Sequence, residues 1–77
     1  MPFQQQFDLS FTLATAGPVS VVLYDQTGRK VASILEAKAY SAGTHTITVP
    51  AAALAPGLYI ANVEADGQVL SRKTIKL

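Results

Sequence analysis

Apolar and polar side chains alternate along several short stretches of the chain. The strictest alternation runs over Gln6–Ala14, where the apolar residues are Phe7, Leu9, Phe11 and Leu13. A period of two residues is typical of a β-strand with one buried face. The pattern therefore predicts a first strand whose apolar side chains enter the core.

Similar strand patterns recur along the rest of the chain. Alternation and β-branched residues predict further strands over Val19–Tyr24, Thr44–Val49, Leu58–Ala65 and Gln68–Leu77. Another strand, the third in chain order, begins at Arg29 and runs to about Leu35. Its alternation slips at residues 33–35, which indicates either a bulge or an early end of the strand.

Two segments have less regular patterns. Glu36–Ala42 contains alanine but lacks a helix cap and ends in a turn, so a loop or a short edge strand is favoured over a helix. Pro50–Leu54 has proline at a first helical position and is compatible with one helical turn.

Glycines mark the turns between the predicted strands. Asp25–Gly28 has the composition of a tight hairpin in which Gly28 takes a positive φ. Asp66-Gly67 is typical of a type I′ turn, and Gly43 closes a turn before the Thr44 strand. Pro56-Gly57 predicts a type II turn with Gly57 at its second central position.

Six to seven short strands without a long helix predict an all-β fold, an immunoglobulin-like antiparallel β-sandwich. The length of 77 residues indicates one domain over residues 1–77, with residues 1–5 flexible or added by cloning. The expected core consists of Phe7, Leu9, Phe11, Val21, Leu23, Val31, Ile47, Val49, Tyr59 and Val63. The opposite strand faces leave Val22, Leu58 and Ile60 as an apolar patch for a partner or a second copy.

Composition excludes several classes of function. The net charge is +1 and only 14% of residues are charged, which provides no electrostatic footprint for nucleic acid or for an anionic membrane. The chain has no cysteine, so no disulfide supplements its core.

The candidate chemistry is sparse. His45 is the only histidine, and no cysteine or carboxylate accompanies it at the spacing of metal ligands, so we expect it to pack on its strand. No Gly-x-Ser-x-Gly motif presents a nucleophile. We therefore expect no enzyme activity, no cofactor, no metal and no small-molecule substrate.

Four segments in order resemble one protein family. Residues 19–31 (VSVVLYDQTGRKV), 41–45 (SAGTH), 54–59 (LAPGLY) and 72–77 (RKTIKL) are similar to the C-terminal sorting domain of the type IX secretion system, type A, of Bacteroidota. The resemblance implies an immunoglobulin-like secretion signal that directs an N-terminal cargo domain through the periplasm and across the outer membrane. The product would be secreted or held at the cell surface.

The resemblance also implies partners and recognition residues. The partners would be the translocon, shuttle and sortase components of the machinery, and a weak homodimer is a further expectation. The sorting-signal candidates are Gly57, Tyr59, Gly67, Lys73 and Lys76. Tyr59 is expected to serve first as a core aromatic whose hydroxyl reaches the backbone. Lys73 and Lys76 are expected to supply mainly surface charge, as docking charges or as a solvated edge.

A second class of function remains open on the sequence alone. Structural immunoglobulin-like modules, such as those of flagellar hook-capping proteins or surface adhesin repeats, have similar strands and a similar Gly-x-Tyr segment. A sorting domain ends its parent protein, whereas a structural module is typically followed by more protein.

Overall fold

The computed structural model describes residues 2–3, 6–50 and 52–77 of the chain. These residues form strands and turns, without a helix. The strands are β1 (Pro2–Phe3), β2 (Gln6–Leu13), β3 (Gly17–Asp25), β4 (Lys30–Tyr40), β5 (Gly43–Pro50), β6 (Gly57–Ala65) and β7 (Gln68–Lys76). The predicted all-β class is confirmed. Of residues 1–5, Pro2 and Phe3 form β1, and the others lie outside the described part.

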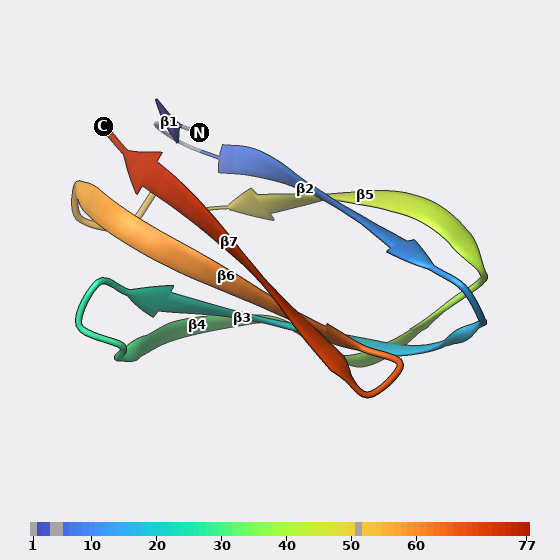
Figure 1. Ribbon diagram of the computed structural model, residues 1–77. Helices are drawn as coiled ribbons and strands as arrows, with labels where there is room; N and C mark the ends of the chain where they lie inside the picture. The colour runs from blue at the N-terminus through green and yellow to red at the C-terminus, as the bar shows by residue number, and fades with distance from the viewer. Residues whose placement is uncertain (1, 4–5, 51) are drawn as a thin grey trace.

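Two sheets pack face to face as a sandwich (Figure 1). The larger sheet has the order β1-β7-β6-β3-β4, and the smaller one pairs β2 with β5. Neighbouring strands are antiparallel except β1 and β7, which are parallel. The immunoglobulin-like sandwich that the strand spacing predicted is therefore confirmed.

The core lies between the inner faces of the two sheets. Alternation in β2, β3 and β6 sends every second side chain inward, as predicted. The buried apolar residues are Phe7, Leu9, Phe11, Leu13, Val19, Val21, Leu23, Val49, Tyr59, Ala61 and Val63. Val31 and Ile47 were also expected there, but they are only partly buried and pack against the core from β4 and β5, each at an edge of its sheet.

Strand β4 is longer and less regular than the sequence indicated. It continues to Tyr40, and its register with β3 shifts at three places. Each shift adds one residue on the β4 side, so Ile34 is an extra residue between Ser33 and Leu35 and both Ile34 and Leu35 are half-buried. The slip in alternation is thus a bulge, and residues 36–40 are edge strand.

The turn between β3 and β4 is built around Asp25. Its Oδ1 accepts hydrogen bonds from the backbone N–H of Thr27 (2.9 Å), the Thr27 hydroxyl (2.6 Å) and the backbone N–H of Arg29 (3.0 Å). The Thr27 hydroxyl is the main reason why the pKa of Asp25 lies below its usual value. The stabilisation from this shift is present above the unfolded-state pKa and is lost as pH falls through the lower folded-state pKa.

The predicted glycine conformations are partly confirmed. Gly28 has a φ of 87°, and Asp66 and Gly67 have φ values of 53° and 71°, as a type I′ turn requires. Gly57, however, has a φ of 153°, far from the value of about 80° for a type II turn, because it already pairs with Lys76 as the first residue of β6. The helical turn that was considered for Pro50–Leu54 is not formed, since residues 52–54 form a non-helical turn. Ala51 lies outside the described residues.

The outer face of the larger sheet carries the expected apolar patch. Val22, Leu58 and Ile60 are half-buried and alternate with the core residues of β3 and β6. Residues 36–40 continue β4 within the sheet, so they do not fold over this patch. We name this surface, together with Lys73 and Ile75 of β7, the outer patch.

We expect Gly28→Val to lower the free energy of unfolding by about 1–2 kcal/mol, because an L side chain is strained at this φ. No atom lies within 4 Å of an added Cβ, so the loss would come from the backbone alone. Gly17→Ala is the control, since Gly17 has no positive φ and its added Cβ would meet only Asp66 Oδ1 at 3.9 Å. Urea unfolding that gives equal losses for both variants would contradict the prediction.

A second prediction concerns the core. Phe11→Ala should cost about 3–5 kcal/mol, because it removes a buried ring and leaves a cavity. Val69→Ala should cost less than about 1 kcal/mol, since Val69 is 57% exposed. Chemical denaturation of both variants tests the assignment of faces, and a Phe11→Ala loss as small as that of Val69→Ala would refute it.

Candidate functional site

Three of the predicted signal residues meet at one end of the sandwich. The pairing of β6 with β7 places Gly57 opposite Lys76 and Tyr59 opposite Thr74. Directly opposite residues share a face of the sheet, and this face is the inner one because Tyr59 is buried. Gly57, Tyr59 and Lys76 therefore surround the segment that leads from β5 to β6.

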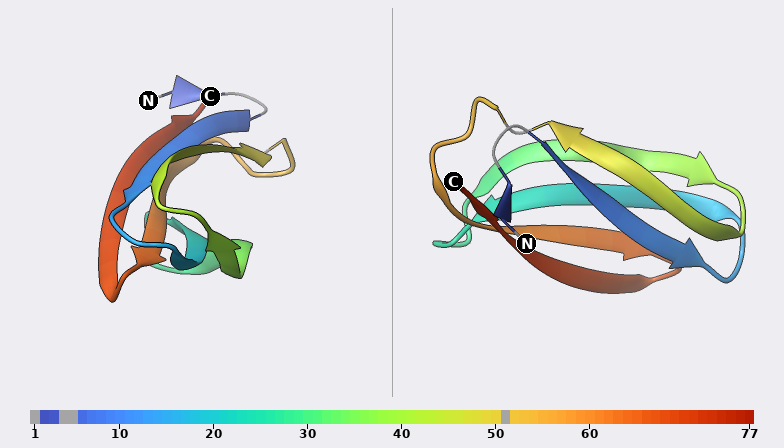
Figure 2. Two further views of the ribbon diagram at one scale, coloured as in Figure 1. Left: turned by 90° about the vertical axis from the view of Figure 1, so that its right-hand side faces the viewer. Right: turned by 90° about the horizontal axis from the view of Figure 1, so that it is seen from above.

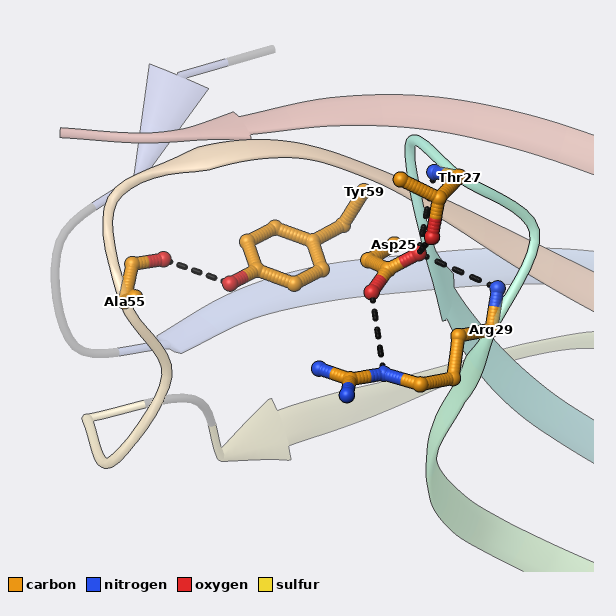
Figure 3. A network of polar contacts seen from close by, with 5 residues as sticks. All are labelled: Asp25, Thr27, Arg29, Ala55 and Tyr59. Atoms are coloured by element: carbon orange, nitrogen blue, oxygen red, sulfur yellow. Dashed lines mark hydrogen bonds and ion pairs between the residues drawn. The ribbon is translucent and has the colours of Figure 1, made fainter.

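Tyr59 acts as predicted, as a core aromatic with a polar end. It is 6% exposed, and its hydroxyl donates a hydrogen bond of 2.5 Å to the carbonyl oxygen of Ala55 (Figure 3). A tyrosine hydroxyl bonded to backbone a few residues upstream is a known stabilising device of immunoglobulin-like sandwiches. The Asp25 hairpin lies at the same end, since Asp25 is paired with Tyr59 across β3 and β6.

Lys76 corrects the expectation of a surface charge. Its residue is 8% exposed, and its Nζ donates hydrogen bonds to the carbonyl oxygens of Ala52 (2.8 Å) and Leu54 (2.5 Å). Hydrogen bonds from an ammonium group are stronger than those between neutral groups, particularly when water is excluded. Lys76 is thus a tether between the last strand and the β5–β6 connection.

The remaining candidates lie elsewhere. Lys73 is exposed on the outer face, opposite Ile60, and Ile75 beside it is 46% exposed. Gly67 is in the turn at the far end of β6 and β7, with Gly43 at the start of β5. The structure therefore brings Gly57, Tyr59 and Lys76 together and separates them from Lys73 and Gly67.

A signal for the burial of Lys76 was present in the sequence. Once Asp66-Gly67 is a two-residue turn, residues at equal distances on either side of it are paired. Counting outward gives Ala65 with Gln68, Tyr59 with Thr74 and Gly57 with Lys76. Lys76 must then share the face of Tyr59, although the polar residues of β7 resemble a solvent-facing set.

The described residues do not assemble a cluster of metal-binding side chains. Within residues 2–3, 6–50 and 52–77, no group of three or more His, Asp or Glu side chains is placed to hold a metal ion. His45 packs on β5 with its ring centroid 4.9 Å from Tyr40 and 5.7 Å from Phe11, and its Nε2–H donates to the Ser41 carbonyl. This is the packing role expected for it.

The sequence model of the secretion system C-terminal sorting domain family matches residues 1–77. The chain belongs to this family. No curated protein sequence matches the chain. The family assignment confirms the resemblance found in the sequence, and it favours the sorting domain over the structural module.

Family membership defines the function. The domain is a C-terminal sorting signal of the type IX secretion system, which exports its cargo across the outer membrane to the cell surface or the medium. It therefore interacts with the secretion machinery and is attached to a cargo protein, and the family implies a non-enzymatic role. We name the end of the sandwich that holds Gly57, Tyr59 and Lys76 the tethered end. The tethered end and the outer patch with Lys73 carry four of the five candidates, and Gly67 lies in neither.

We expect Lys76→Met to lower the free energy of unfolding by about 1.5–3 kcal/mol, because the carbonyl groups of Ala52 and Leu54 lose a charged donor. Lys73→Met is the matched control on the same strand. Its side chain is exposed, so the change should stay within about 0.5 kcal/mol. Equal losses in thermal and urea unfolding would show that the tether adds no stability.

Proposed function

We propose that the type IX machinery recognises the folded domain through the outer patch, with Lys73 as its docking charge. Lys73 faces Ile60 across β6 and β7, and Ile75 faces Leu58 in the same way. Lys73 is thus an exposed cation beside the apolar side chains of Leu58, Ile60 and Ile75. This combination supports recognition, because apolar contact supplies binding energy and charge supplies orientation.

The tethered end supports recognition indirectly. Lys76 and Tyr59 hold the β5–β6 connection through backbone carbonyls, so they fix the first residues of β6, where Leu58 and Ile60 project to the other face. In this proposal Gly57, Tyr59 and Lys76 position the patch, and Lys73 contacts the partner. Gly67 contributes by fixing the register of β6 with β7.

The proposal also includes the partners of the domain. Residues 1–77 act as one domain with the cargo domain on its N-terminal side, and the shuttle, translocon and sortase components act on it in turn. A weak homodimer through the outer patch would compete with the machinery for the same surface.

Lys73→Glu should leave the melting temperature unchanged and block export of a fluorescent cargo fused to the domain in a type IX-competent bacterium, with the cargo retained in the periplasm. The reversed charge is exposed, where single ion pairs contribute only about 0–1 kcal/mol to stability. Arg72→Glu is the matched control, because Arg72 is adjacent, exposed and paired with Ala61 on the other face.

Fractionation of the cells and fluorescence of the medium provide the readout. Normal export of Lys73→Glu would overturn the proposed role of the outer patch. Retention of the unaltered fusion in the periplasm would instead count against the sorting activity of this chain.

A further inference from the structure

The smaller sheet leaves part of the larger sheet uncovered. It consists of β2 and β5, whereas β7, β6, β3 and β4 face it from the other side. Strands are spaced about 4.8 Å apart, so two strands cannot span the width of four. Figure 2 shows the result in its end-on view, with β2 near β7 on one side and β5 above β4 on the other.

The two margins of the sandwich differ in size. A groove of about 560 Å³ lies between β4 and β5, whereas the groove between β2 and β7 measures about 300 Å³. The larger groove is lined by Ile34, Leu35 and Ile47, which are half-buried, and by Tyr40 and His45 at one end. Its apolar side chains are the part of the core that β2 and β5 leave partly open to solvent.

The bulges of β4 direct a cation into this groove. Leu35 pairs with Val21 and Lys38 pairs with Val19, so the extra residue between them keeps Leu35 and Lys38 on the same, inner face. Ala37 at this bulge has a φ of 50°, and its N–H donates to the Ser20 hydroxyl. In a regular strand, residues three apart would point to opposite faces.

Lys38 is the charged residue of the groove. Its Nζ lies 5.4 Å from the centre of the Tyr40 ring, a cation–π contact. Within the described part of the chain, no carboxylate lies within ion-pair distance of Lys38, and the groove lining contains none. The groove therefore has positive charge at one end and apolar side chains along its length.

The edges of the two bordering strands are not equivalent. β4 is interrupted by its bulges, which makes it a poor template for another strand. β5 pairs with β2 through eight consecutive residues without a register shift, and among the described strands its other edge has no neighbour. An extended chain can add to this edge of β5 and place alternate side chains over the groove.

We propose that the β4–β5 groove binds an extended segment of a partner protein as a third strand of the smaller sheet. The segment pairs with the free edge of β5, directs alternate apolar side chains onto Ile34, Leu35 and Ile47, and directs one carboxylate to Lys38. This inference does not depend on the outer patch, because the groove lies on the inner side of the larger sheet.

The test uses synthetic nine-residue peptides in which threonine alternates with valine. One valine, at the second or the eighth position, is replaced by glutamate, glutamine or lysine, so that both strand directions are sampled. We expect the glutamate peptide to bind, with amide chemical shifts changing along residues 34–40 and 45–49. The lysine peptide should bind roughly tenfold more weakly at low salt.

A charge swap provides the decisive comparison. Lys38→Glu should weaken binding of the glutamate peptide roughly tenfold and strengthen binding of the lysine peptide, while the melting temperature of the domain stays unchanged. Lys30→Glu is the matched control on the same strand, because Lys30 is exposed and lies outside the groove. It should leave both affinities unchanged.

Several results would overturn the proposal. These are absence of binding by the glutamate peptide, shift changes confined to β7 or the outer patch, and equal binding of all three peptides. Self-association of the unaltered domain with shift changes at the groove would identify the occupant as a second copy and would also overturn it. Export of the fluorescent cargo is a separate readout, so failure here leaves the proposed role of the outer patch standing.

Discussion

The connection from β5 to β6 constrains the whole sandwich, because it carries the chain from the smaller sheet to the larger one. Its backbone carbonyls at Ala52, Leu54 and Ala55 are held by the Lys76 ammonium and the Tyr59 hydroxyl. Both donors come from paired strands of the larger sheet. The last strand thus fixes the position of a segment more than twenty residues upstream, and the two sheets are joined through side chains as well as through the core.

The regular part of this fold is readable from the sequence. Alternation placed Phe7, Leu9 and Phe11 in the core, because one buried face imposes a period of two on a strand. Glycine chemistry placed the turns at Gly28 and Gly67 for a related reason, since a positive φ excludes most other residues. Each of these features is determined by interactions within one strand or one hairpin, which the local sequence encodes.

The features that were missed depend on pairing between strands. The bulges of β4 are defined only by its register with β3, and the run Ile34-Leu35 is apolar at both positions, so its pattern does not show which residue is extra. For Lys76 the pattern is clear but misleading. The polar positions of β7, Thr74 and Lys76, face inward, while Ile75 faces outward, so polarity alone assigns the wrong face. The register set by the Asp66-Gly67 turn overrides that polarity.

The larger sheet presents a different surface on each of its two faces. Because β7 turns Ile75 and Lys73 outward, it completes an apolar and cationic patch on the outer face of the larger sheet, around Ile60. Because the smaller sheet is only two strands wide, the inner face stays open beside β4, where Lys38 points. These surfaces lie on opposite faces of one sheet, so a partner on one does not block the other.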